Sequence, residues 1–353
     1  MRAVPNLSEN RTTLSQPLPP SKLARRFVPL ALGGVVVLAV LLVAYVGLGS
    51  VYLNPNEVIM ALLDKPVEAF HRQIVWELRL PRGITAILAG MMLGLAGAIL
   101  QTVTRNPLAS PGLTGVSAGA VLAAIAGLTF FPALATAGFL LPFVAAIGGV
   151  GVGVVVYLLS RQGRTDPLRL ALNGILLGAV LNSGTSIILI FDQERAANIV
   201  LWLIGSLNGR TWEHLNSLWP WAALVIPVGL GCAGLANALN LGDDVAAGLG
   251  QDVERARAGL FLVAIFLTSA AVATVGAIGF IGLIGPHISR RLVGNDTRRL
   301  FPMSALVTAI ILLLADFIVV AVTKGGLPVG AVTSMLGAPF FLYLIFKRMN
   351  AGA

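Results

Sequence analysis

The amino-acid sequence predicts an all-α, polytopic membrane protein with ten transmembrane helices and with both the N- and C-termini in the cytoplasm. Three observations carry this prediction: the composition, the lengths of the apolar segments and the positions of the basic residues. Of the 353 residues, 57% are hydrophobic and 11% are charged. A soluble domain carries about 25% charged residues, so the composition excludes an ordinary soluble protein. The net charge of +9 reflects membrane topology rather than nucleic-acid binding, because the basic residues follow the boundaries of the apolar segments.

Ten apolar segments reach, or nearly reach, the length of about 20 residues that a bilayer core of roughly 30 Å requires. The eighth is short and broken by glycine. A further apolar piece, 199–207, is too short to cross, and we expect it at the membrane interface with Trp202 and Trp212 as anchors. The ten segments are 28–49, 83–103, 112–131, 138–159, 168–191, 217–240, 258–278, 279–293, 303–322 and 329–346.

The chain divides into a short tail and one membrane domain. Residues 1–27 are polar, contain several prolines and end in basic residues, which predicts a disordered cytoplasmic tail. The apolar run 28–49 is longer than the core of a signal peptide, so we expect an uncleaved first span. Residues 28–349 form the ten-helix domain, and its longest hydrophilic cytoplasmic loop covers about 240–257.

The basic residues fix the orientation of these spans. With the N-terminus inside and ten crossings, 17 of the 24 lysines and arginines fall inside and 7 fall outside. This asymmetry agrees with the positive-inside rule. Removing one weak span would reverse everything after it and place Arg290, Arg291, Arg298 and Arg299 outside. Ten crossings are therefore the consistent solution.

The stretch from Arg79 to Ala120 is the most distinctive part of the chain. A basic turn at Arg79 and Arg82 precedes an apolar run, 84–103, that is rich in glycine and alanine. Small residues at a spacing of three or four let membrane helices approach closely. A polar corner, 104–108, then leads into a second glycine-rich apolar run. We expect two closely packed helices joined by a tight corner.

Few residues in this sequence could carry out chemistry. The sequence contains no nucleophile elbow, no metal-spaced cluster of cysteine and histidine and no Walker-type phosphate loop, so we expect no catalytic residues, no metal site and no cofactor on this chain. Asp316 is essentially the one charge inside a span; it either serves an ion-driven carrier or is satisfied by backbone groups or by an arginine from another span. Asn173 and Asn182 either line a polar path or hold helices together. His287, after a glycine-proline pair, is either a gate residue or a structural histidine.

Several long blocks resemble the FecCD-type permeases of ABC importers for iron-siderophore complexes, haem and vitamin B12. These blocks are RLPR, LAGAILQTVTRNPLASPGLTGVSAGA, LNLGDDVAAGLGQDVERAR, GAIGFIGLIGPHISRRLVGNDTRR and LPVGAVTSMLGAPFFLYLIFKR. The resemblance implies a bacterial inner-membrane protein, surrounded by lipid, with ten spans. It also implies a second permease subunit, two cytoplasmic ATPases that hold ATP and magnesium, and an extracytoplasmic substrate-binding protein. A ferric siderophore is the favoured substrate, with vitamin B12 or haem as alternatives. A secondary carrier, or a membrane anchor or receptor without transport, is the alternative from a different class.

The resemblance also assigns roles by matching position. It places docking of the binding protein at the outward-facing basic residues, a cytoplasmic gate at the corner and the start of the fifth span, ATPase coupling in the loop 240–257, and the path along the fifth and tenth spans. Two departures from the family pattern stand out: Phe317 follows the aspartate of the ninth span where the family often has a docking arginine, and the start of the fifth span matches only in part. The residues are Arg79, Arg82 and Lys324 for docking; Asn106, Leu108, Thr165 and Asp166 for the gate; Gly242, Asp243, Asp244, Gly248 and Gly250 for coupling; and Asn173 and Asn182 for the path.

Overall fold

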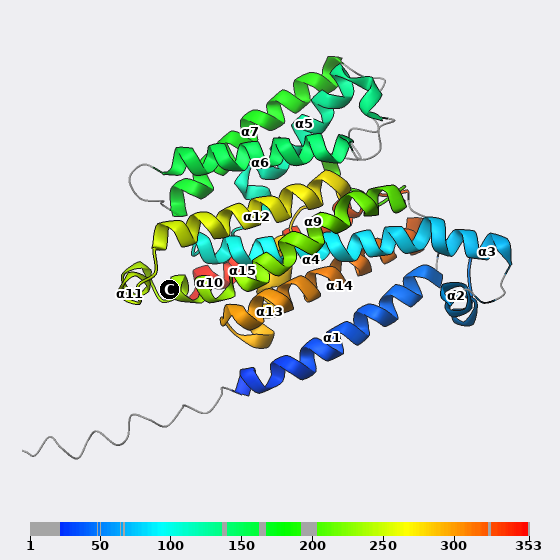
Figure 1. Cartoon of the computed structure of the whole chain (residues 1–353), viewed down its shortest axis with the longest axis horizontal. Helices are drawn as coiled ribbons and strands as arrows, with labels where there is room; N and C mark the ends of the chain where they lie inside the picture. Colours follow the sequence, from blue (N-terminus) through cyan, green and yellow to red (C-terminus); the bar gives the residue numbers. More distant parts are fainter. Residues whose placement is uncertain are drawn as a thin grey trace, which may run out of the picture.

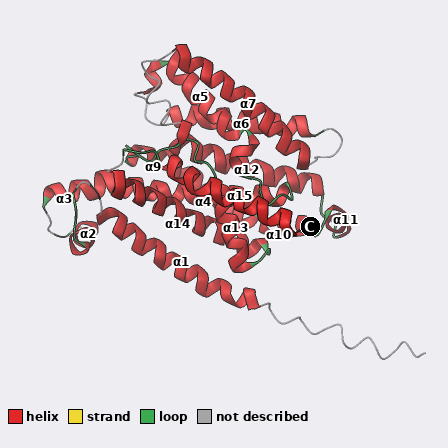
Figure 2. Cartoon of the chain, turned by 180° about the vertical axis from the view of Figure 1, so that it is seen from behind, coloured by secondary structure: helices red, strands yellow, loops and turns green. Residues whose placement is uncertain are grey.

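Every regular element that the structure describes is helical. The computed structural model describes residues 22–47, 49, 51–63, 65, 68–135, 140–161, 167–191, 203–323 and 326–351. Figure 1 shows the long helices lying side by side, and the view from behind shows the same arrangement without a strand in the described part (Figure 2). The helices are α1 (Lys22–Gly47), α2 (Pro55–Leu62), α3 (Ala69–Gln73), α4 (Leu80–Val103), α5 (Val116–Phe130), α6 (Leu140–Ser160), α7 (Pro167–Phe191), α9 (Trp212–Gly231), α10 (Ala233–Asn240), α11 (Asp243–Gly248), α12 (Val253–Val275), α13 (Ile281–Val293), α14 (Thr297–Thr323) and α15 (Val329–Ala351).

The ten apolar segments expected from the sequence all contain helix. The first helix begins at Lys22 rather than Val28, so part of the expected tail is helical, while residues 1–21 lie outside the described part. The sixth segment is bent by 42° between α9 and α10. This break falls at Cys232, beside Gly231, after the two prolines at positions 220 and 227 that lie inside α9. Of the interfacial piece 199–207, only residues from 203 onward are described.

Six described helices are long and apolar enough to cross a membrane, and the bent pair α9–α10 would add a seventh. The apolar parts of α5 and α15 are shorter, and α13 is shorter still. These helices are consistent with a polytopic membrane protein that is helical throughout the regular elements of the described residues. The six spans are Arg26–Gly47, Ala69–Val103, Leu140–Ser160, Leu168–Phe191, Val253–Val275 and Thr297–Thr323.

Helix α4 is the centre of the fold. It packs against α14, α12, α9 and α13, while α5, α6 and α7 form a neighbouring group and α1 lies at the outer edge (Figure 1). Its small residues make these contacts possible: a Cβ at Gly97 would overlap the Gly282 carbonyl oxygen, and one at Gly94 would overlap Thr308. Glycine is therefore required at both positions for α4 to reach its neighbours.

The two ends of α4 define two ends of the molecule. A single π-helical turn, Ile74–Arg79, joins α3 to α4, so α2 and α3 lie at the end where α4 begins. At about 1.5 Å per residue, the 24 residues of α4 extend roughly 36 Å, enough to cross a bilayer core. Helix α11 lies at the opposite side of the molecule (Figure 1). We call these the Arg82 end and the Arg105 end.

Candidate functional site

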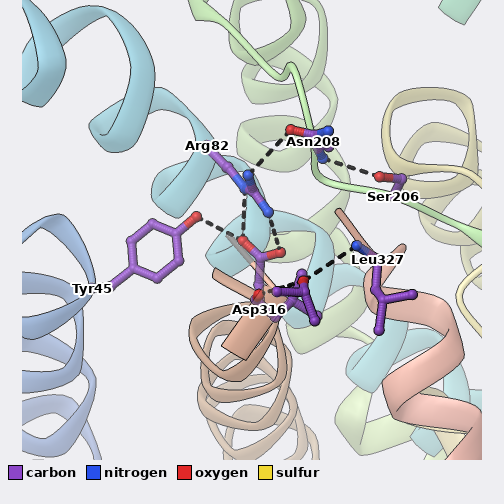
Figure 3. A network of polar contacts seen from close by, with 8 residues as sticks. Tyr45, Arg82, Ser206, Asn208, Asp316 and Leu327 are labelled. Atoms are coloured by element: carbon purple, nitrogen blue, oxygen red, sulfur yellow. Dashed lines mark hydrogen bonds and ion pairs between the residues drawn. The ribbon is translucent and has the colours of Figure 1, made fainter. Parts of the chain in front are cut away.

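A buried ion pair joins α4 to α14 at the Arg82 end. Arg82 donates from Nε to Asp316 Oδ2 (2.8 Å) and from Nη2 to Asp316 Oδ1 (2.7 Å), a two-point contact (Figure 3). The Tyr45 hydroxyl on α1 donates to Asp316 Oδ2 at 2.6 Å. The Asp316 side chain is 0% exposed and that of Arg82 is 13% exposed. Of the interpretations left open for Asp316, the structure shows that an arginine from another span, Arg82, satisfies its carboxylate.

The same arginine reaches the loop that precedes α9. Arg82 Nη1 lies 3.5 Å from Asn208 Oδ1, and the backbone N–H of Asn208 donates to the Ser206 hydroxyl (Figure 3). The Gly205 carbonyl of this loop accepts a hydrogen bond from the N–H of Gly330, near the start of α15. Arg82 therefore belongs to a network that ties α1, α4, α14 and this loop together.

The neighbouring Arg79 is also engaged within the chain. Its guanidinium donates to the carbonyl oxygens of Val46 (2.7 Å) and Val51 (2.5 Å). Val46 lies in the last turn of α1, where backbone carbonyls lack helical partners, so Arg79 caps that helix. In this conformation both arginines assigned to docking support the fold, and their docking role stays a prediction. Lys324 lies outside the described residues.

Arg210 adds positive charge to the Arg82 end. It lies in the loop between Asn208 and α9, and its Nε is buried without a hydrogen-bond partner among the residues that the structure describes. Burial, and in second place the nearby charge of Arg82, lowers the pKa of Arg210 to about 10. The guanidinium still carries its charge at neutral pH. Arg82 and Arg210 therefore lie close together at this end, where the family resemblance places a docking partner.

At the other end of α4, the corner is a compact turn. The Asn106 side-chain oxygen accepts from the N–H of Leu108 at 3.0 Å, and the Asn106 carbonyl accepts from the N–H of Ala109 at 3.0 Å. Asn106 is exposed and Leu108 is half-buried. This confirms the tight corner, while the gate role of both residues stays a prediction. Thr165 and Asp166, the other two expected gate residues, fall outside the described ranges.

The predicted coupling loop forms a short helix at the Arg105 end. Gly242 precedes α11 with φ 109° and Gly250 follows it with φ 81°, two left-handed positions that favour glycine. Asp244 and Gly248 are exposed. Asp243 instead accepts hydrogen bonds from Arg257 and Arg105. The loop thus has one side fixed to the membrane domain and one side free to contact another molecule.

The two path asparagines differ in their surroundings. Asn173 on α7 donates to the hydroxyl of the buried Ser160 at 3.0 Å, so it joins α7 to α6. Asn182 is exposed and lines a cavity of about 240 Å³ together with Ser117 and Gly279. Of the two functions left open, the structure shows helix contact for Asn173 and a partly polar cavity for Asn182.

His287 makes an edge-on contact with the ring of Phe340 at 5.5 Å, which joins α13 to α15. No group of three or more histidine, cysteine, aspartate or glutamate side chains in the described ranges could hold a metal ion.

The sequence prediction missed five residues that complete these networks. The orientation of the spans contains a usable signal for the Arg82 end, since it places Arg82 and Asp316 near the same membrane face. That signal identifies the Arg82–Asp316 pair itself. No comparable signal in the sequence identifies the five missed residues, because their contacts depend on how the helices and loops fold together. The missed residues are Tyr45, Asn208 and Arg210 at the Arg82 end, and Arg105 and Arg257 at the Arg105 end.

Comparisons with known proteins bear on the whole of this arrangement. A family model for the FecCD transport family matches residues 37–347. The Fe(3+)-citrate import system permease protein YfmE of Bacillus subtilis (strain 168) is 42% identical over 311 residues, covering 88% of this chain and 92% of the relative. YfmD, a permease protein of the same system and organism, is 38% identical over 279 residues, covering 78% and 82%.

A solved structure extends the similarity to three dimensions. An ABC transporter described as of metal-chelate type, in an inward-facing conformation, matches with a TM-score of 0.80 at 28% identity. The match covers 91% of this chain and 99% of that chain. Because these similarities run through the Arg82 end, the Arg105 end and the helices between them, the chain belongs to the FecCD transport family, as the blocks in its sequence imply.

Proposed function

We propose that the chain is a transmembrane permease subunit of an ATP-driven, binding-protein-dependent importer of ferric chelates, of the siderophore or citrate type. The observation that carries this proposal is the similarity, over most of both chains, to two permease proteins of one Fe(3+)-citrate import system. That one organism has two such related permeases supports pairing of this chain with a second permease subunit, either a related chain or a copy of itself. The substrate crosses between the two subunits by alternating access, as the inward-facing relative supports.

We further propose ten crossings of a bacterial inner membrane with both termini in the cytoplasm. The length of α4 supports opposite sides for Arg82 and Arg105. The excess of basic residues on one set of loops supports the Arg105 end as the cytoplasmic one. The Arg82 end then faces the extracytoplasmic binding protein, with Arg79, Arg82 and Lys324 as the docking residues for acidic side chains on that partner.

The proposed ATPase contact is α11. Val245 and Leu249 are 50% and 67% exposed there, which is a substantial apolar surface for a loop outside the membrane. ATP and magnesium belong to two partner ATPase subunits, so this chain is a transporter subunit and not an enzyme. Closure of the ATPases around nucleotide would shift α11 and thereby favour one of two permease conformations.

A secondary carrier is less well supported by the geometry. Such a carrier needs an ionisable group that exchanges protons or ions along the path. Asp316 is the acidic side chain buried within the described spans, and Arg82 and Tyr45 already occupy its oxygens. A carboxylate held in this way serves helix packing.

The test is uptake by proteoliposomes that contain the permease pair, the ATPase and the binding protein. We expect accumulation of radiolabelled iron from ferric citrate or a ferric siderophore only when ATP and the binding protein are both supplied. Haem and vitamin B12 serve as competing substrates, and accumulation of either in place of the ferric chelate would reassign the cargo. Uptake that continues without ATP but stops when the proton gradient is dissipated would establish the secondary carrier instead.

A further inference from the structure

One carboxylate joins three separate elements at the Arg105 end. Asp243, the first residue of α11, accepts hydrogen bonds from Arg257 Nη2 at 3.0 Å to Oδ1 and 3.3 Å to Oδ2. Arg257 lies in the first turns of α12 and is only 4% exposed. On its other side, Asp243 Oδ1 accepts from Arg105 Nη2 in the corner after α4. A buried base therefore fixes the acid in place, and the acid in turn holds the corner.

The backbone of Arg105 adopts an unusual conformation at this corner. Its φ is 48°, in the left-handed region that residues other than glycine seldom adopt. Such a conformation persists where surrounding contacts determine it. The same Nη2 that contacts Asp243 also donates to the Leu239 carbonyl at 3.2 Å, in the last turn of α10. Arg105 is thus held by both α10 and α11.

The residues that follow Arg105 form a hydrogen-bonded turn. Asn106 comes directly after Arg105, and its side chain and carbonyl bind the N–H groups of Leu108 and Ala109. The turn is closed by its own hydrogen bonds, so we expect a change at Arg105 to displace Asn106 and Leu108 together. These are the two residues assigned to the gate.

We propose that the Arg105–Asp243 contact transmits movement of α11 to the corner 104–108, so that both are positioning residues for the gate. The inference rests on the proposed function, in which α11 contacts the ATPase. A shift of α11 either moves the corner with it or breaks the Arg105–Asp243 contact. Either outcome changes the relative stability of the open and closed states of the gate. The Asp243–Arg257 pair keeps α11 oriented on α12 meanwhile.

The most selective variant is Arg105→Gln, because it removes the ion pair between the corner and Asp243 and leaves the Asp243–Arg257 pair in place. In the complete reconstituted importer, we measure the ratio of iron transported to ATP hydrolysed. We expect this ratio to fall about fivefold, the lower limit of typical coupling between distant sites. Basal ATP hydrolysis and co-purification of the ATPase should stay unchanged. Arg105→Lys keeps a positive nitrogen within reach of Asp243 and should restore at least half of the wild-type ratio.

The matched control is Arg255→Gln. Like Arg105, Arg255 is an arginine that pairs with an aspartate, and it lies near the start of α12. Its side chain is 90% exposed, and its acid partner, Asp252, lies only three residues before it. Its replacement should leave the transport ratio unchanged. If Arg105→Gln does not reach the membrane, Arg105→Met likewise removes the contact to Asp243 and leaves the Asp243–Arg257 pair in place, and it should show the same fall.

Three results would overturn the inference. The first is a wild-type ratio in Arg105→Gln. The second is a parallel loss of transport and ATP hydrolysis, or of ATPase binding, which would make Arg105 an assembly residue. The third is a fall in Arg255→Gln as large as that in Arg105→Gln, which would remove any special role for the corner. Absence of ATP-driven uptake by the wild-type complex is a different result, since it would refute the proposed function itself.

Discussion

Removing the charge of Asp316 should destabilise the protein strongly. In Asp316→Leu, the guanidinium of Arg82 loses both charge-assisted contacts and the Tyr45 hydroxyl loses its acceptor. Breaking one side of a buried ion pair costs about 3–5 kcal/mol, because the remaining charge stays in a poorly solvated site. At about 2 °C per kcal/mol for a large domain, the thermal midpoint should fall by roughly 6–10 °C.

Removing both charges together should cost much less than either single change. The double variant Arg82→Met with Asp316→Leu leaves no unpaired ion, and replacing a buried pair by apolar side chains is often neutral. Only the Tyr45 hydroxyl then lacks a partner, a loss of about 1–3 kcal/mol. The assay is thermal unfolding of the detergent-solubilised permease for the wild type, both single variants and the double variant.

Tyr45→Phe and Tyr52→Phe form a matched pair for the third member of the network. Tyr45 is 2% exposed and donates to Asp316, whereas Tyr52 is 64% exposed. The first change should lower the midpoint by a few degrees and the second should leave it in place. For the ion pair itself, additive losses in the double variant Arg82→Met with Asp316→Leu, with no recovery over the two single variants, would refute the view that Arg82 and Asp316 stabilise the fold as a pair.

Three further predictions concern packing, pH and orientation. Gly97→Ala should destabilise the permease by about 1–3 kcal/mol through overpacking, whereas Gly33→Ala, in open surroundings, should not; equal midpoints would contradict the close packing of α4. Burial by itself raises the pKa of Asp296, but hydrogen bonds and the charges of neighbouring arginines outweigh burial and lower this pKa below its ordinary value. The stabilising effect of Asp296 is therefore present above the ordinary carboxyl pKa of about 4 and is lost as the pH falls through the lowered pKa. Asp296→Asn should reduce the loss of thermal midpoint on acidification, and an unchanged loss would rule this out. In spheroplasts, a membrane-impermeant thiol reagent should label Tyr52→Cys from outside and Leu249→Cys only after permeabilisation, and the reverse pattern would invert the topology.

Much of the fold could be predicted because a membrane leaves few choices for an apolar chain. Backbone polar groups must be satisfied within each segment, so a long apolar run with few charges becomes a helix. This is why the segments 83–103 and 303–322 coincide closely with α4 and α14. The start of α1 and the bend between α9 and α10 were not predicted. Both depend on local breaks in the helix and on packing against neighbouring helices, and the length of an apolar segment contains no information about either.

The candidate site was predicted less well, because its contacts join residues far apart in the sequence. The charge count correctly identifies Arg79 and Arg82 as unusual basic residues beside a span. It cannot show that one caps α1 or that the other pairs with Asp316, 234 positions away. The corner shows the same limit: the motif marks Asn106 and Leu108, whereas the contact from Arg105 to Asp243 depends on how α10 and α11 fold back.

The two ends of α4 differ in a way that predicts which one moves. At the Arg82 end the ion pair is almost fully buried, and midway along the helix Gly94 packs directly against α14, so α4 and α14 are closely joined there. At the Arg105 end the side chains of Arg105 and Asp243 are 40% and 38% exposed. Exposed pairs contribute about 0–1 kcal/mol, against several for buried ones, so the Arg105 end can rearrange at far lower cost. A cycle of opening and closing should therefore alter the corner and α11 while the Arg82–Asp316 distance stays constant.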